Sequence, residues 1–395
     1  MKIIGYELKK IFNWRILMIL LIFTVLFYHF YLHTCLTSDF DNGHPSTERC
    51  EAGIELMQKY GVEISPAEQK DFANVSFPKS KDAVNKLILG LPDFQKAGIS
   101  SVDQFEALDQ SDRGADRKLC SKLIQTLFQD KTHNIKIPYS YDAKRRIVEY
   151  DFRQITQADM EEQILRYPGN KQDRIRIVKS RTALSPLPND TLIVNYDRSA
   201  VRLSLLLLFT VMILVSPFLV GDKMNRIRQL TYSFRTGRRL YFSQLAAALI
   251  AAVAGVAVQL AIFFLLDFDF AHQQVPLFFK FFECNISGLE KNVYWFDLTF
   301  GQYIAIGVAL MAALALGFTF FSFLLSHMCR TYVSVFAVQI PVAFIGGWLC
   351  NQLLSGMFSI GKAQWMEVWI CAAILVVGFS LCIFFGWREQ KVDID

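Results

Sequence analysis

The chain has 395 residues, of which 53% are hydrophobic, with 35 phenylalanines, a formal net charge of +5 and a mean hydropathy of +0.28. This composition is too apolar for an ordinary soluble domain and excludes that class. The sequence contains no G-x-x-x-x-G-K-[ST] phosphate loop and no H-E-x-x-H, G-x-S-x-G or paired C-x-x-C motif. We therefore expect a non-enzymatic chain with no cofactor, no metal site and no nucleic-acid partner.

Six apolar stretches are each long enough to cross a membrane. About 18 apolar residues in a helix span roughly 30 Å of hydrocarbon, and a helix satisfies its own backbone groups in lipid. The stretches cover residues 16–33, 203–220, 245–266, 303–325, 332–350 and 368–387. The expected fold class is an α-helical polytopic membrane protein, with the second span at 201–220 and spans three to six within 245–387.

Residues 1–15, "MKIIGYELKKIFNWR", form an amphipathic segment before the first span. In a helix, Ile4, Leu8, Ile11 and Phe12 lie on one apolar face, whereas Lys2, Lys9 and Lys10 reach phosphate head groups. The first span is too long for a cleaved signal peptide, and no small-residue cleavage site follows it. We expect it to remain as an anchor.

Basic residues set the expected orientation, because short cytoplasmic loops are enriched in Lys and Arg. The N-terminal segment and the connector at 221–244 are basic and are placed in the cytoplasm, together with the tail at 388–395, which contains Arg388 and Lys391. The outer loop at 267–301 has only Lys280 and Lys291 against Asp267, Asp269, Glu283, Glu290 and Asp297. Both termini are therefore predicted to be cytoplasmic, and residues 34–200 extracytoplasmic.

Residues 34–200 have a polar composition and the length of one domain. Ser65-Pro66 with Glu68 indicates a helix start, and helix-forming stretches surround Gly114. The segments "NIKIPYSYD" and "RRIVEYDFRQI" alternate apolar with polar residues and predict a β-hairpin. We expect an α+β domain inserted after the first span.

Four cysteines, at 35, 50, 120 and 284, lie on the predicted outer side of the membrane. A disulfide persists there if the compartment is oxidising. We predict a disulfide between Cys50 and either Cys35 or Cys120.

The connector carries six Lys or Arg residues and a single acid, Asp222. Topology alone is one explanation for that charge. The segment "GDKMNRIRQLTYSFRTGRRLYFSQLAAA" also resembles the cytoplasmic segment of class-2 ABC transporter permeases, which have an acid at the end of the second span, then a leucine, a hydroxyl residue and a Gly-Arg pair. The matching positions are Asp222, Leu230, Ser233, Gly237 and Arg238. Asp replaces the usual Glu, and Gln244 replaces the usual Lys.

The N-terminal segment resembles the helix that family members lay along the inner membrane surface. Six spans with a large external insertion are similar to a branch common in bacteria, which implies the bacterial plasma membrane. The resemblance implies a permease subunit that pairs with a second permease copy or homologue and with two ATPase subunits, which hold ATP and Mg²⁺. It implies export of a peptide, antibiotic or lipid-like compound.

The connector chemistry suits contact with such an ATPase. Arg235, Arg238 and Arg239 can pair with carboxylates, and Gly237 permits a turn that a side chain would obstruct.

Polar residues inside the apolar stretches are candidates for a substrate pathway between two permeases, with interhelical packing as the alternative. They are Thr210, Ser216, Gln259, Thr319, Ser322 and Gln339, the last preceding Pro341, where a proline invites a kink. The stretches contain no Asp, Glu, Lys or Arg, which argues against an ion-coupled carrier.

The outer-loop segment "VPLFFKFFE" suits the membrane interface, where it either gates release of substrate or forms an aromatic belt. A second function stays open for the whole chain. In that alternative the protein is a non-transporting sensor or anchor whose external domain binds a ligand.

Overall fold

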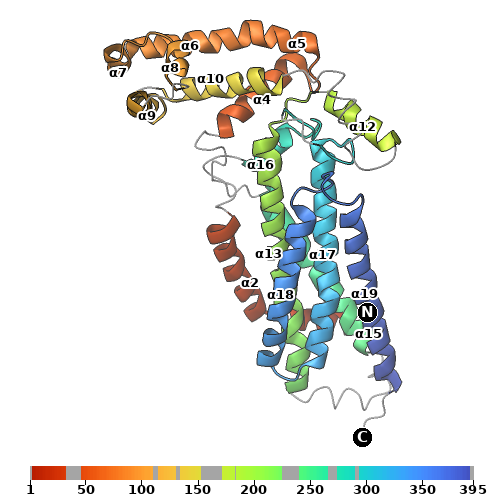
Figure 1. Cartoon of the computed structure of the whole chain (residues 1–395). Coiled ribbons are helices and arrows are strands. Elements are labelled where there is room, and N and C mark those ends of the chain that lie inside the picture. Colours follow the sequence, from red (N-terminus) through yellow and green to blue (C-terminus); the bar gives the residue numbers. More distant parts are fainter. Residues whose placement is uncertain are drawn as a thin grey trace. The chain divides into compact units, whose positions relative to one another are not determined.

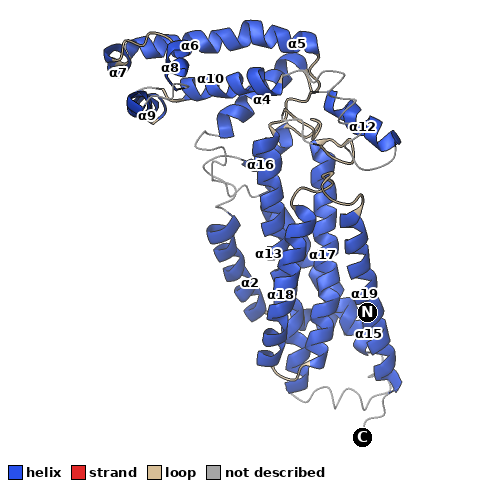
Figure 2. Ribbon diagram, in the orientation of Figure 1, coloured by secondary structure: helices blue, strands red, loops and turns tan. Residues whose placement is uncertain are grey.

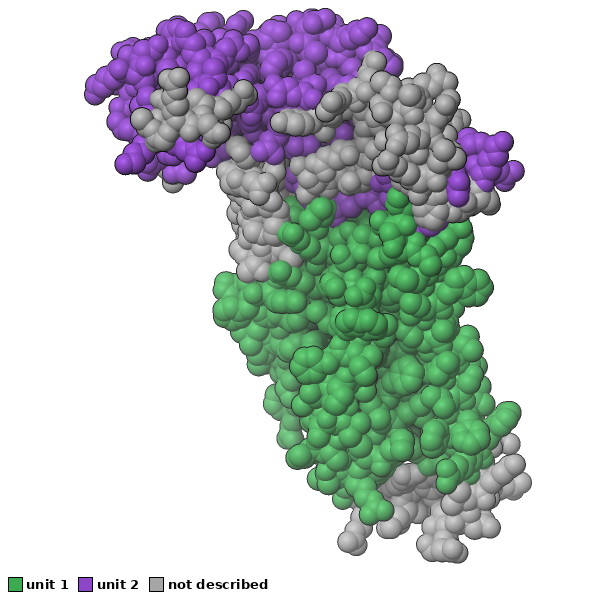
Figure 3. Space-filling view, in the orientation of Figure 1, with its two compact units in different colours: residues 1–38, 194–276, 302–395 green, residues 39–193, 277–301 purple. Residues whose placement is uncertain are grey.

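The computed structural model describes residues 2–32, 46–109, 114–129, 134–152, 171–182, 184–224, 240–265, 274–289 and 293–391. The chain forms two compact units (Figure 3). Unit 1 comprises residues 1–38, 194–276 and 302–395, and unit 2 comprises residues 39–193 and 277–301. The regular structure in these described ranges is helical, without a strand (Figure 2).

Six helices of the described ranges are long and apolar enough to span a membrane, as the sequence predicted (Figure 1). They are α2 (Trp14–Phe27) with its π-helical extension η1 (Tyr28–Leu32), α13 (Asn189–Met224), α15 (Leu240–Leu265), α17 (Phe300–Met328), α18 (Tyr332–Leu354) and α19 (Met366–Lys391). The protein is therefore a helical multi-pass membrane protein. Helix α13 begins earlier than the predicted residue 201, because its polar first turns include the buried residues Asn195, Asp197 and Ser199.

The predicted N-terminal helix is confirmed as α1 (Lys2–Ile11). It packs against α15, with Ile11 fully buried and Ile4 and Leu8 half-buried. Part of the apolar face expected to contact lipid is therefore used within unit 1. Asn13 then caps α2, because its side chain accepts a hydrogen bond from the Arg15 backbone N–H at 3.1 Å.

Helix α13 is the most buried of the six candidate spans. Small residues on its neighbours allow close approach, as is common between membrane helices. A Cβ added at Gly255 of α15 would lie 2.8 Å from Leu214, and one at Gly346 of α18 would lie 2.3 Å from Leu208. Helices α15 and α18 therefore each pack closely on α13.

Unit 2 consists of short helices around two apolar cores. The helices are α4 (Ser46–Tyr60), α5 (Pro66–Asp71), α6 (Phe77–Gly90), α7 (Pro92–Lys96), α8 (Val102–Asp109), α9 (Gly114–Phe128), α10 (Lys136–Arg146) and α12 (Lys171–Thr182), with π-helical turns η2 (Phe72–Ser76) and η3 (Ile147–Asp151). One core contains Val84, Phe94 and Leu123, and the other contains Leu56 and Phe72. Helix α10 joins both, through Tyr141 and Ala143 respectively.

The predicted β-hairpin is wrong, and with it the α+β expectation for residues 34–200. Its two segments form α10 and η3 in the described part. Pro138 lies in the first turn of α10, where its missing N–H is tolerated, and the buried Tyr141 follows three residues later. Helical packing thus overrides the local strand preference. Bridge-type pairing in the described ranges is limited to Ile64–Leu184 and Asn285–Thr299.

The predicted helix start at Ser65 is confirmed. Ser65 and Glu68 form a reciprocal capping box at the start of α5, with the Ser65 backbone N–H donating to Glu68 Oε2 at 2.7 Å. These hydrogen bonds hold the pKa of Glu68 below its ordinary value. Helices α8 and α9 also confirm the helical stretches on either side of residues 110–113.

The outer-loop segment forms the short helix α16 (Gln274–Lys280) and the turn after it. Phe278 and Phe281 are buried, whereas Phe279 and Phe282 are exposed, and their rings stack at 5.7 Å. The exposed pair keeps the aromatic surface that the sequence assigned to a membrane interface. Contact with a membrane remains a prediction.

Cys35, one of the three cysteines in the predicted disulfide, lies in the segment 33–45, which is outside the described residues. Cys50 lies on α4, and Cys120 lies in the core that contains Val84. No disulfide joins Cys50 to Cys120. Of the two predicted pairings, only Cys50 with Cys35 stays a prediction.

Candidate functional site

The basic connector is described only at its two flanks. Asp222 and Lys223 end α13, and Gln244 lies in the second turn of α15. The other residues of the resemblance lie outside the described residues, namely Leu230, Ser233, Arg235, Gly237, Arg238 and Arg239. The candidate coupling site is therefore built from the flanks and from what they contact, and we call this region the connector end.

Asp222 joins α13 to the N-terminal helix. Lys10 Nζ lies 2.8 Å from Asp222 Oδ2 and 3.2 Å from Glu7 Oε1, and Gln244 Nε2 donates to Asp222 Oδ2 at 3.5 Å. Gln244 occupies the position at which the resembled family has Lys. The cation beside Asp222 is supplied instead by Lys10 of α1.

Burial shifts the ionisation of this cluster. It raises the pKa of Glu7 above its ordinary value, although Lys10 opposes that change. For Lys10, burial lowers the pKa, but the hydrogen bond and charge of Asp222 outweigh it, so the net pKa is raised. Lys10 therefore remains charged at neutral pH, and its closest contact is with Asp222.

Lys223 binds the C-terminal end of α17. Its Nζ donates to the carbonyl oxygens of Ser326 at 3.4 Å and Cys329 at 2.9 Å, and also to that of His327. Carbonyl groups in the last turn of a helix lack intrahelical partners, and the helix dipole there attracts a cation. Asp222 and Lys223, at the start of the connector, thus tie α13 to α1 on one side and to α17 on the other.

Helices α15 and α19 also reach the connector end. His327 of α17 contacts Glu389 of α19 through its Nε2, and the Tyr241 ring of α15 lies 5.1 Å from the His327 ring. Side-chain contacts at the connector end therefore link α13 and α15, which flank the connector, to α1, α17 and α19.

The predicted pathway residues form two separate interhelical contacts inside unit 1. Gln259 Nε2 donates to Thr24 Oγ1 at 2.7 Å and to Thr210 Oγ1 at 3.4 Å, which joins α15 to α2 and α13. Gln339 Nε2 of α18 donates to Ser216 Oγ of α13. The Ser326 hydroxyl of α17 donates to the Ser216 carbonyl oxygen at 2.6 Å.

The remaining predicted pathway residues are also buried. Thr319 donates to Ala315 O of its own helix at 2.8 Å, and Ser322 Oγ has no partner among the described residues. Helix α18 continues through Pro341. All six polar residues are at most 3% exposed, which agrees with the interhelical-packing alternative. Their assignment to a substrate pathway stays a prediction.

Sequence reasoning missed a cluster at the opposite end of the spans, which we call the clamp end. Asp197 of α13 accepts hydrogen bonds from the Tyr303 hydroxyl at 2.8 Å and from the Gly356 N–H at 2.7 Å. Tyr303 Oη in turn accepts the Met357 N–H at 3.1 Å. Asp197 therefore ties α13 and α17 to the loop between α18 and α19.

Glu367 completes the clamp end. It is fully buried, its Oε1 accepts the Phe358 N–H at 3.1 Å, and its Oε2 has no partner among the described residues. Lys362 Nζ lies 3.6 Å from Glu367 Oε1 and donates to the Gln352 and Ser355 carbonyl oxygens. Burial lowers the pKa of Lys362, although Glu367 and Asp197 oppose this.

The clamp end corrects the expectation that the spans hold no acid. Asp197 and Glu367 lie inside α13 and α19 but just outside the apolar stretches that start at 203 and 368. The sequence did contain a signal for this cluster, namely a single acid within one or two helical turns before the start of an apolar stretch. Phe358 also has a positive φ of 57°, which is unusual for a bulky residue and is held by the Glu367 hydrogen bond.

An apolar groove of about 840 Å³ lies between α2, α13 and α18. Aromatic side chains dominate its walls, with Phe23 and Phe27 from α2, Phe209 from α13, and Phe344 and Trp348 from α18. Arg202 of α13 lies beyond this stretch and donates to the Tyr31 carbonyl oxygen. The groove is therefore suited to an apolar chain or ring system.

Comparison with family models, with curated proteins and with solved structures finds no match to this chain. Among the described residues, no group of three or more His, Cys, Asp or Glu side chains is placed to hold a metal ion.

Proposed function

We propose that this protein is the membrane-spanning permease subunit of an ATP-driven exporter of the class-2 ABC type. In this proposal unit 2 lies outside the cytoplasm, both termini lie inside, and ATP is hydrolysed by a separate subunit present in two copies. A second permease copy or homologue completes the assembly in the bacterial plasma membrane.

The observation that supports the proposal best is the pair of contacts made by Asp222 and Lys223. They lie at the start of the connector and bind two different elements, α1 through Lys10 and α17 through its C-terminal carbonyl groups. A connector that only fixes topology needs neither contact. A connector that transmits movement from an ATPase needs links of this kind to more than one helix.

The apolar groove supports a lipid-like or otherwise amphipathic substrate. Its volume of about 840 Å³ lies within the range of small-molecule sites, roughly 300–1,000 Å³. Its aromatic walls offer few hydrogen-bonding groups to a strongly hydrophilic compound. In the proposed exporter, movement of α13 alters the groove because Leu205 and Phe209 form part of its wall.

The test is purification of the full-length protein from its native membrane in mild detergent, followed by identification of co-purifying proteins and assay of ATP hydrolysis. We expect an ABC ATPase to co-purify. Gly237→Val and Arg238→Glu should insert normally but reduce the ATPase yield or the substrate-stimulated hydrolysis at least severalfold. Arg226→Gln is the matched control, because it removes one connector charge nearer the span.

Orientation is tested independently by labelling single cysteines in intact cells. A cysteine at Arg228 should be protected from an impermeant reagent. Labelling from outside at this position would overturn the proposed topology. In the ATPase assay, full coupled hydrolysis in both Gly237→Val and Arg238→Glu would show that these two residues have no coupling role.

A ligand-binding sensor is the second candidate, and a pocket within unit 2 favours it. That pocket has apolar walls and a charged rim, as described below. Absence of any co-purifying ATPase would favour the sensor, whereas an ATPase that responds to the state of the connector would favour the exporter.

A further inference from the structure

Unit 2 contains a pocket of about 330 Å³ between α6, α8, α9 and α10. Val84, Phe105, Ile124 and Phe128 supply apolar wall from three of these helices. The volume is at the lower end of the range for small-molecule sites and is sufficient for one aromatic ring system with a short side arm. The pocket lies wholly within unit 2.

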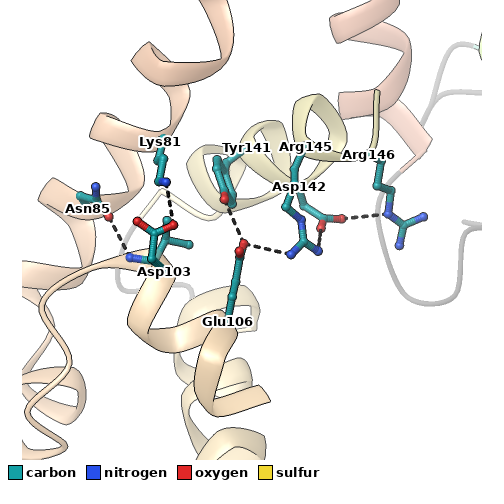
Figure 4. Close-up of polar contacts among 9 residues, drawn as sticks. Lys81, Asn85, Asp103, Glu106, Tyr141, Asp142, Arg145 and Arg146 are labelled. Atoms are coloured by element: carbon teal, nitrogen blue, oxygen red, sulfur yellow. Dashed lines mark hydrogen bonds and ion pairs between the residues drawn. The ribbon is translucent and has the colours of Figure 1, made fainter. Parts of the chain in front are cut away.

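Charged side chains on one side of the pocket form a continuous hydrogen-bonded chain (Figure 4). Glu106 Oε1 accepts hydrogen bonds from the Tyr141 hydroxyl and from Arg145 Nη1, both at 2.9 Å. Arg145 Nη2 donates to Asp142 Oδ1 at 3.0 Å, and Arg146 Nε lies 3.3 Å from Asp142 Oδ2. These contacts hold the Glu106 carboxylate in a fixed position on α8.

The hydrogen-bonding capacity left in this chain is an acceptor on Glu106 and a donor on Arg145, whose buried Nε has no partner among the described residues. Both contacts to Glu106 use Oε1, and Oε2 accepts no hydrogen bond from the described residues. The two terminal nitrogens of Arg145 are instead already occupied by carboxylates. Burial and the Glu106 charge raise the pKa of Tyr141, so its hydroxyl remains a donor to Glu106 at neutral pH.

A carboxylate oxygen with spare capacity beside an apolar pocket is complementary to a cation attached to an apolar group. Glu106 and Asp142 already occupy the terminal nitrogens of Arg145, so an anionic ligand would compete with them there. We propose that this pocket binds an amphipathic amine, with its apolar ring system between Phe105 and Phe128 and its ammonium group on Glu106 Oε2. This assignment does not depend on whether the protein transports anything.

The test uses three small probes of similar shape and different charge, namely tryptamine, tryptophol and indole-3-propionate. Binding to the full-length protein in nanodiscs of zwitterionic lipid is measured by calorimetry, with empty nanodiscs as the blank. We expect tryptamine to bind at least tenfold more tightly than tryptophol, and indole-3-propionate to bind most weakly.

Two variants locate the site. Glu106→Gln keeps the size of the side chain and an acceptor for Tyr141, and it should weaken tryptamine at least tenfold while leaving tryptophol nearly unchanged. Ile124→Trp fills the pocket from a half-exposed position and should abolish binding of all three probes. Asp103→Asn is the matched control, because Asp103 lies on the same helix, pairs with Lys81 at 2.6 Å and does not line the pocket.

Three results would each overturn the proposal. They are unchanged tryptamine affinity in Glu106→Gln, tighter binding of the carboxylate than of the amine, and no binding of any probe at millimolar concentration. Circular dichroism of each variant, compared with that of the unchanged protein, separates loss of the site from loss of the fold.

Discussion

The two ends of unit 1 are held together by different chemistry. At the clamp end, two carboxylates and a phenol bind three consecutive backbone N–H groups, those of residues 356–358. At the connector end, the contacts come from lysine side chains together with Gln244 and His327. The Lys10 side chain is 38% exposed, although its partners Glu7 and Asp222 are only 5% and 13% exposed. Asp197 and Glu367 of the clamp end are, in contrast, 8% and 0% exposed.

This difference decides which end can move with less loss of free energy. A buried donor that loses its acceptor costs about 1–3 kcal/mol, because water does not replace the lost partner. A partly exposed ion pair contributes about 0–1 kcal/mol, since water and salt replace much of it. We therefore expect the clamp end to be the fixed point and the connector end to be the part that rearranges, as the proposed coupling to an ATPase requires.

The largest effect is expected from Asp197→Ala at the clamp end. The substitution leaves the Tyr303 hydroxyl and the Gly356 N–H without their acceptor. We expect the free energy of unfolding to fall by about 2–4 kcal/mol, measured by denaturant titration in mixed micelles.

Asp197→Asn is the matched control for this experiment. Its side-chain oxygen can still accept one of the two hydrogen bonds, so it should lose less than half as much stability as the alanine variant. An alanine variant as stable as the unchanged protein would show that the clamp end is not a fixed point.

A smaller effect is expected at Glu367. Glu367→Ala removes the acceptor of the buried Phe358 N–H and should lower the free energy of unfolding by about 1–3 kcal/mol. Glu367→Gln keeps an oxygen for Phe358 and removes a buried charge, so we expect its stability to lie within about 1 kcal/mol of the unchanged protein. Equal losses in both variants would mean that the charge, rather than the backbone hydrogen bond, holds the loop.

At the connector end, the expected change on removing an ion pair is smaller again. Lys10→Met should lower the free energy of unfolding by about 1 kcal/mol, because it leaves Asp222 and Glu7 without their shared cation. Adding Asp222→Asn should restore part of that loss, and a double-mutant cycle measures the coupling. Faster amide exchange in residues 2–11 of Lys10→Met is the second readout, since α1 packs beside this pair.

The six spans were predictable because a membrane helix is apolar over its whole length. The length of an uninterrupted apolar stretch is therefore enough to identify a span. Their ends were less predictable. The polar first turns of α13 include the buried residues Asn195, Asp197 and Ser199, and a polar sequence gives no sign of such burial. The clamp end was missed for this reason.

The helical nature of unit 2 shows a second limit. "NIKIPYSYD" alternates as a strand does, yet Tyr141 and Ala143 are both buried in a helix, because α10 packs in both cores of unit 2. Alternation distinguishes a strand from a helix only when one face is exposed, and a helix between two cores buries more than one face. Asp222 was identified from the connector pattern, but its partner Lys10 is 212 residues away in the chain.

The smallest effect concerns Glu7 and gives a pH dependence for the connector end. Burial raises the pKa of Glu7 above the ordinary value of 4.5, so the folded protein holds this proton more tightly than the unfolded chain. Stability should therefore fall as pH rises from 4.5 through the raised pKa, and this contribution should then stay constant. Glu7→Gln should not lose this stability over this pH range, because an amide does not ionise.

The measurement is the difference in free energy of unfolding between Glu7→Gln and the unchanged protein, from pH 4 to pH 8. The difference should be near zero at the acid end and should favour the glutamine variant at neutral pH, by an amount that the attraction of Lys10 keeps small. If glutamine is instead destabilising at neutral pH, the attraction of Lys10 outweighs burial. The charges would then stabilise the connector end more than the exposure of its side chains indicates. The difference between the two ends in the free energy that their contacts contribute would be smaller.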